Sequence, residues 1–134
     1  MNTFTEAELE YLKLQRTGRL ATVNKRGEPQ IAPVTFSYNE ELDTIDIGGP
    51  DNSTSQKFRN IARNGLASFV VDDHIDGVGR GIEIRAHAEV VPEGGQVLHP
   101  AFSPELIRLR PKRIISWDRS GKTLPWPASR RNVR

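Results

Sequence analysis

The stretch TIDIGGPDNSTSQKFRNIARN, residues 44–64, decides the fold and raises the first functional hypothesis. Its apolar start predicts a short strand, two glycines follow, and a cluster of hydroxyl residues that includes Ser53 and Thr54 opens a helix predicted over 54–63. Such a turn leaves backbone N–H groups free, and the helix dipole favours an anion there. Lys57, in the first turn, adds a positive charge. The pattern favours a phosphate site, with simple N-capping by Ser53 or Thr54 as the alternative.

Upstream of this stretch the sequence has the texture of β-strands. Strands are predicted over 19–23 and 30–38, and tight turns join them to each other and to a strand over 44–47. Pro33, inside the second strand, cannot donate a ladder hydrogen bond. It therefore marks an edge, a bulge or a place where another group, such as a flat ring, lies alongside an antiparallel meander.

The segments before and after the elements described so far predict further helices and strands. A capping box at Thr5 and Glu8 predicts a helix over 6–15. Downstream, period-two alternation and apolar runs predict strands over 66–71, 81–91 and 113–117, a single helical turn over 105–109, and loops over 73–80 and 95–106.

Composition narrows the class of protein. The 134 residues are typical of one domain, and the absence of cysteine excludes disulfides and thiolate chemistry. No apolar run approaches a membrane span, so a soluble cytoplasmic protein is expected.

Charge is uneven along the chain. The formal net charge is +2, but from residue 108 onward nine lysines and arginines stand against Asp118 alone. We expect a core over 1–117 and a basic, extended arm over 118–134. Such an arm can bind an anion, an acidic protein surface or nucleic acid. Because no nucleic-acid motif accompanies it, nucleic acid is not the expected partner.

Candidate catalytic and metal-binding residues are few. The acidic cluster that begins at Asp72 has the residue types of a metal site but no diagnostic spacing, so no metal is predicted. No serine or paired-carboxylate motif supports a hydrolase. His87 and Tyr38 are weak candidates for a proton donor.

The order of motifs carries a family resemblance. The segments GRLAT (18–22), PVTF (33–36), the block over 53–64 and VDD (71–73) follow one another as in the pyridoxamine 5′-phosphate oxidase-like split β-barrel flavoproteins, which the chain resembles over 4–117. The sequence of these motifs is most similar to the branch of the family that uses the deazaflavin coenzyme F420. Within that branch it is similar to small actinobacterial-type enzymes that reduce polycyclic substrates such as tetracycline precursors.

The resemblance implies a mainly β fold, an FMN-binding split β-barrel of six antiparallel strands in a Greek-key-like order, with flanking α-helices. It implies a homodimer with the cofactor at the subunit interface. Placed on matching positions, the family's cofactor-binding residues are Pro33, Val34, Thr35 and Phe36 at the ring, Gly48 and Gly49 on the approach, Ser53, Thr54 and Lys57 at the phosphate, and Trp117 from the second subunit.

The implied activity is transfer of hydride between coenzyme F420 and a small organic substrate. Flavin and deazaflavin chemistry is carried by the cofactor, which agrees with the lack of a catalytic motif. The FMN-using oxidases carry an Arg-Lys type pair where this chain has Thr54 and Ser55, with Lys57 as the remaining cation. This departure favours F420 over FMN. An FMN-dependent reductase or oxidase, and a non-catalytic flavin- or F420-binding protein, are the alternatives.

Overall fold

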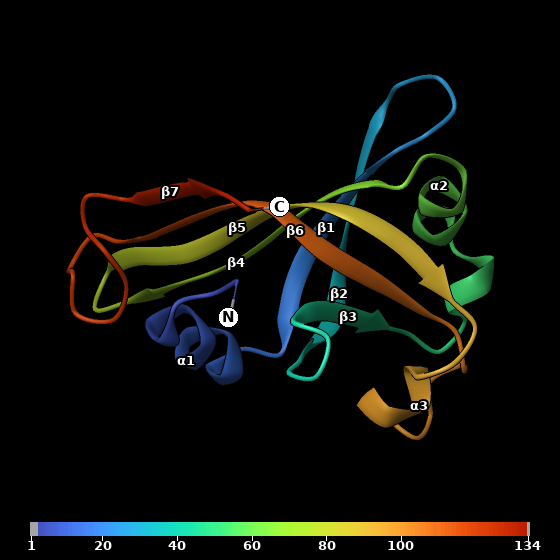
Figure 1. The fold of residues 1–134 in the computed structure, drawn as a ribbon, viewed down its shortest axis with the longest axis horizontal. Coiled ribbons are helices and arrows are strands. Elements are labelled where there is room, and N and C mark those ends of the chain that lie inside the picture. Colours follow the sequence, from blue (N-terminus) through green and yellow to red (C-terminus); the bar gives the residue numbers. More distant parts are fainter. Residues whose placement is uncertain (1–2, 134) are drawn as a thin grey trace.

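Six antiparallel strands close into a barrel in the computed structural model, which describes residues 3–133 (Figure 1). Around the barrel the strands follow the order β3-β2-β1-β4-β5-β6, and pairing of β3 with β6 closes it. The bounds are β1 Thr17–Val23, β2 Pro29–Asn39, β3 Thr44–Gly48, β4 Leu66–Ile75, β5 Val78–Val91 and β6 Leu106–Asp118. The predicted six-stranded split barrel is confirmed.

Alternation along the strands divides core from surface. On β5, Ile82 and Ile84 point into the barrel and are fully buried, whereas Arg85 and His87 are exposed. On β2, Val34 and Phe36 face inward, and the ring of Phe36 packs edge-on against Phe69 at 5.2 Å between centroids. The inward side chains of these strands therefore form the core, and the outward side chains form the surface of the barrel.

Pro33 lies in the half of β2 that pairs with β1 alone, because pairing with β3 begins only at Thr35. It stands opposite Arg19 in the register. The missing N–H of proline costs no ladder bond at such an edge. Of the three alternatives that the sequence left open for Pro33, the structure shows an edge position.

Helix α1 (Glu6–Leu14) begins with the predicted capping box. The backbone N–H of Glu8 donates to Thr5 Oγ1 (3.2 Å), and the N–H of Thr5 donates to Glu8 Oε1 (2.9 Å). The helix buries Tyr11 and Leu12. It packs at the end of the barrel where the tip of the β4–β5 hairpin and the β6–β7 connection also lie (Figure 1).

Helix α2 (Gln56–Asn64) starts two residues later than predicted, because Asn52–Thr54 form a short 3₁₀ turn, η1, before it. The N-cap is Ser55, whose Oγ accepts from the N–H of Phe58 at 3.3 Å. The prediction that Ser53 or Thr54 caps this helix is therefore wrong. Gly65, at a φ of 67°, ends the helix in the left-handed conformation.

Two local predictions are corrected. The helical turn predicted at 105–109 is instead the start of β6, because Ile107 and Leu109 alternate with arginines and are fully buried in the closed barrel. A four-residue helix, α3, lies earlier, at Gly95–Leu98. The loop predicted at 73–80 is a hairpin, with β4 and β5 joined by a turn at Asp76 and Gly77. Both have positive φ, as a two-residue type I′ turn requires.

The C-terminal arm adds to the sheet. Strand β7 (Ser129–Asn132) pairs antiparallel with β6 over 113–116, on the far side of β6 from β5. Residues 129–132 of the arm are therefore held by a sheet ladder. None of the helices within residues 3–133 has the length and apolar character to cross a membrane.

Candidate cofactor site

A cavity of about 260 Å³ lies between the first turn of α2 and the hairpin of β1 and β2, and we call it the Lys57 cavity. Thr22 on β1 and Gln30 on β2 stand opposite each other in the register and form part of its wall. The full lining is Leu20, Thr22, Gln30, Ile31, Ala32, Ser55, Gln56 and Lys57.

Lys57 gives the cavity its charge. The side chain is half-buried, and burial lowers the pKa of its ammonium group. Among residues 3–133 no carboxylate forms an ion pair with it. The N–H groups of Gln56 and Lys57 belong to the first turn of α2, where no intrahelical acceptor exists. A partly desolvated cation beside free N–H groups fits a phosphate.

A second cavity, of about 510 Å³, adjoins the first and shares Gln30 and Gln56 with it. We call it the basic cavity, since its lining is Asn24, Lys25, Arg26, Gln30, Gln56, Arg59 and Arg63. In the described part of the chain none of its four cationic side chains pairs with a carboxylate. Arg59 donates to the carbonyl of Thr54 and Arg63 to that of Val23, both at 2.6 Å, so their charges stay unneutralised.

The predicted phosphate residues separate into two groups. Lys57 lines the cavity, but Ser53 and Thr54 are exposed in η1 and do not. The hydroxyl of Thr54 donates to the carbonyl of Asp51 at 2.9 Å. Ser55 lines the cavity in their place.

The predicted ring-binding residues alternate along β2. Pro33 and Thr35 are exposed on the outer face, whereas the side chains of Val34 and Phe36 are in the core. Only the backbone of Val34 and Phe36 can therefore face a ligand on the outside of the barrel.

The two predicted approach glycines are covered by the segment that follows α3. A Cβ on Gly48 would come within 2.7 Å of the Phe102 ring. The carbonyl of Gly49 accepts both the N–H and the hydroxyl of Ser103, each at 3.0 Å. Glycine at 48 is thus required by packing of this segment onto the end of β3.

The remaining candidates do not line the Lys57 cavity. Trp117 lies on β6 opposite Gly81, and His87 is exposed on β5. Tyr38 lies at the far end of β2 from Gln30 and donates to Asp43 Oδ1 at 2.7 Å. Burial and this hydrogen bond raise the pKa of Tyr38 to about 12.

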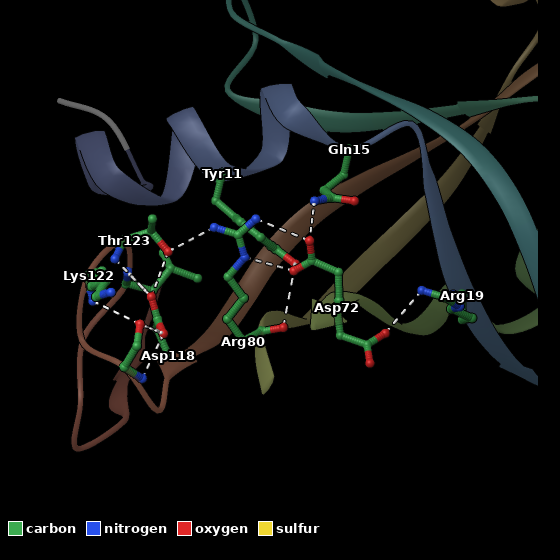
Figure 2. A network of polar contacts seen from close by, with 11 residues as sticks. Tyr11, Gln15, Arg19, Asp72, Arg80, Asp118, Lys122 and Thr123 are labelled. Carbon is green, nitrogen blue, oxygen red and sulfur yellow. Dashed lines mark hydrogen bonds and ion pairs between the residues drawn. The ribbon is translucent and has the colours of Figure 1, made fainter. Parts of the chain in front are cut away.

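The acidic cluster on the β4–β5 hairpin serves structure. Asp72 pairs with Arg19 at 3.0 Å, and Asp73 accepts two hydrogen bonds from Arg80, at 2.8 and 3.1 Å. Figure 2 shows Arg80 reaching from this hairpin toward Tyr11 of α1 and Thr123 of the β6–β7 connection. Within residues 3–133 no group of three potential ligands is arranged for a metal ion.

Sequence reasoning missed Thr22, Gln30 and Gln56 as lining residues. A neutral amide or hydroxyl carries no charge or motif that marks it as functional. The tight turn predicted between 23 and 30 did hold a signal, because it places Thr22 and Gln30 opposite each other in the hairpin.

Comparison with known proteins decides the family. The sequence profile of the pyridoxamine 5′-phosphate oxidase family matches residues 4–130. The chain belongs to this family. The resemblance to the pyridoxamine 5′-phosphate oxidase-like family, drawn from the sequence, is thereby confirmed at the level of the family.

A curated relative and two solved structures are similar to this family member. The 5a,11a-dehydrotetracycline/5a,11a-dehydrooxytetracycline reductase of Streptomyces rimosus is 44% identical over an alignment of 121 residues that covers 88% of this chain and 85% of that protein. A conserved hypothetical protein, Rv2991, of Mycobacterium tuberculosis has a TM-score of 0.72 at 22% identity, over 92% of this chain and 91% of that one. A FAD-binding protein of Mesorhizobium loti has a TM-score of 0.62 at 18% identity, over 83% and 90%. The two structures share the fold.

Proposed function

We propose that this protein is an oxidoreductase that binds coenzyme F420 and transfers its hydride to an unsaturated polycyclic organic substrate. The observation that carries the proposal is the junction of two cavities, one with an unpaired, half-buried Lys57 and one with four unneutralised cations. The ligand that fits is a phosphate with an anionic chain beyond it. When bound, reduced F420 supplies the hydride.

The basic cavity favours F420 over FMN. FMN ends at its phosphate, whereas F420 continues from its phosphate into a chain of carboxylates. Lys57, Ser55 and the first turn of α2 would hold the phosphate, and Lys25, Arg26, Arg59 and Arg63 would attract the chain. FMN would leave these four charges unused.

The reductase relative at 44% identity supports the direction of the reaction and the class of substrate. The protein would orient cofactor and substrate and exclude water. Reduction of a carbon–carbon double bond needs a hydride and a proton. We assign the proton to solvent, because the hydroxyl of Tyr38 donates to Asp43 Oδ1 and His87 lines none of the three cavities described for this protein.

The first test is titration with F420 and with FMN, followed by fluorescence. We expect F420 to bind more tightly than FMN. The Lys57→Ala variant should lose about 1–3 kcal/mol of F420 binding, or roughly ten- to a hundredfold in Kd, because a charged hydrogen bond to the phosphate is removed.

Lys122→Ala is the matched control, since Lys122 is exposed on the β6–β7 connection and lines neither cavity. Unchanged affinity in Lys57→Ala would reject the phosphate site. Tighter binding of FMN would assign the site to a flavin enzyme. Binding of F420 without oxidation of its reduced form by any acceptor would leave a non-catalytic binding protein.

We also propose a homodimer that covers the outer face of β1, β2 and β4. Ile31 is 71% exposed there, between the Lys57 cavity and a third cavity of about 280 Å³ that Ser68 and Phe69 also line. Membership of the family supports a homodimer, and we place its interface on this face because Ile31 lines both cavities there and would be covered with them.

Ile31→Asp should convert the dimer to a monomer, because the charge would have to be desolvated in the interface. Sedimentation velocity measures the change. Leu14→Asp is the control, since Leu14 is 68% exposed on α1, outside this face. A dimer that persists in Ile31→Asp would place the interface elsewhere.

A further inference from the structure

Asn60 is a buried residue of α2 whose side-chain amide forms hydrogen bonds to the β1–β2 hairpin and within α2. Its side chain is fully buried, and its Nδ2 donates to Thr22 Oγ1 at 3.0 Å and to Gln30 Oε1 at 2.8 Å. Its Oδ1 accepts from Gln56 Nε2 at 2.8 Å and from Arg63 at 3.5 Å. Both donors and both lone pairs of the amide are thereby used.

Three partners of Asn60 line the Lys57 cavity, although Asn60 itself does not: they are Thr22, Gln30 and Gln56. A packing contact between α2 and the barrel would need only an apolar side chain. A buried amide with four hydrogen bonds fixes the direction of each partner as well, because a reversed partner would leave a buried polar group unpaired.

The direction that Asn60 imposes is specific. Gln30 gives its oxygen to Asn60, so its Nε2 is the group left to face the cavities. Gln56 gives one N–H to Asn60, and its oxygen accepts from Arg59 at 2.7 Å. The second N–H of Gln56 Nε2 is therefore the group that remains to face the cavities. Among residues 3–133 nothing accepts from these remaining N–H groups.

Gln30 and Gln56 are the two residues that the Lys57 cavity and the basic cavity share, so they stand at the junction. We propose that Asn60 is a positioning residue that turns both glutamines so that N–H groups face this junction, which then selects an acceptor-bearing chain attached to the phosphate. The inference rests on the proposed function, and it adds which part of the ligand the junction recognises, namely the chain beyond the phosphate. A phosphodiester continued by carbonyl and carboxylate groups has acceptors there, and a phosphomonoester has none.

Gln30→Glu tests the proposal without disturbing the core, because Gln30 is exposed and a Glu oxygen can still accept from Asn60. The second oxygen then replaces the N–H at the junction. We measure Kd for F420 and for the phosphomonoester of the same deazaflavin, which lacks the chain. The preference for F420 should fall by about tenfold or more, since a donor becomes a charged acceptor.

Asn60→Asp is the second variant. It keeps the shape of Asn60 but can only accept, so Gln30 would turn its Nε2 inward and present its oxygen to the junction. The preference should fall in the same direction. Gln96→Glu is the charge-matched control, since Gln96 is exposed on α3 and lines neither cavity. It should keep the wild-type preference.

The outcomes separate the two proposals. If the wild type binds F420 but Gln30→Glu weakens both ligands equally or neither, the junction does not read the chain, and the inference fails while the proposed function stands. If the wild type binds neither F420 nor the phosphomonoester, the proposed function and this inference are both rejected. If Asn60→Asp does not fold, as a thermal melt would reveal, the result with Gln30→Glu decides alone.

Discussion

Replacement of Arg131 by alanine should cost about 3 kcal/mol of folding free energy, at the low end of the cost of breaking a buried ion pair, and lower Tm by about 10 °C. Glu8, in the first turn of α1, is fully buried. Arg131, on β7, donates to its two oxygens at 2.5 and 3.0 Å, and Ser116 donates at 2.7 Å. Without Arg131 the charge of Glu8 stays buried with no cation.

The pH dependence identifies the cause. Burial alone would raise the pKa of Glu8, but hydrogen bonds from Arg131 and Ser116 outweigh it and hold the pKa below the usual 4.5. A carboxyl whose folded pKa is lowered contributes stability above its unfolded pKa, and this is lost as pH falls through the folded value. In Arg131→Ala burial dominates and raises the pKa. The deficit of the variant should therefore begin to shrink above pH 4.5, as the raised pKa of its Glu8 is crossed, and continue to shrink as pH falls below 4.5.

Arg130→Ala is the control for this experiment. Arg130 neighbours Arg131 on β7 but is exposed and forms no ion pair among residues 3–133. Chemical denaturation across pH measures both variants. A deficit in Arg131→Ala that is no larger than in the control, or that does not change with pH, would mean that Glu8 does not depend on Arg131.

The contacts of Glu8 also show which features of the fold could be predicted from the sequence and which could not. The capping box at Thr5 and Glu8 is local, and it was predicted correctly. The partner of Glu8 lies 123 residues away, on a strand within what was expected to be an extended arm. No periodicity specifies such a pair, because it depends on how the closed barrel brings its two ends together.

The candidate site divides in the same way. Lys57 was predicted because a lysine at a helix start is a signal that needs no tertiary structure. Gln30, Gln56 and Asn60 were not, since an amide acquires a direction only from partners on other elements. The helical turn predicted at 105–109 failed because closure of β3 against β6 overrides local preference there.

The second large effect is expected for Asp118→Asn. Asp118 is 2% exposed, and its carboxylate accepts five hydrogen bonds from the connection that follows β6, which Figure 2 shows in part. Oδ1 accepts from the N–H and hydroxyl of Ser120, at 2.9 and 2.6 Å. Oδ2 accepts from the N–H and hydroxyl of Thr123, at 2.8 and 2.6 Å, and from the N–H of Leu124 at 3.2 Å.

An asparagine amide can accept on its oxygen alone, so its NH₂ group would face donors. We expect a loss of about 2–4 kcal/mol, the cost of leaving one or two buried donors unsatisfied. Burial alone would raise the pKa of Asp118, but the hydrogen bonds from Ser120 and Thr123 hold it far below 3.8. Its contribution is present above 3.8 and lost only as pH falls well below that value. Asp118→Asn should therefore remain less stable than the wild type through mildly acidic pH.

Asp76→Asn is the matched control, because Asp76 is exposed and asparagine tolerates its φ of 52°. Thermal melts and hydrogen exchange compare the two variants. In Asp118→Asn, exchange should rise first at Thr123 and Leu124, since the backbone N–H groups of both residues donate to Asp118 Oδ2 in the wild type. Equal stability of the two variants would contradict the role of Asp118. Under the proposed function, F420 affinity at low temperature should stay at the wild-type value, because Asp118 lines neither the Lys57 cavity nor the basic cavity. This separates loss of fold from loss of the site.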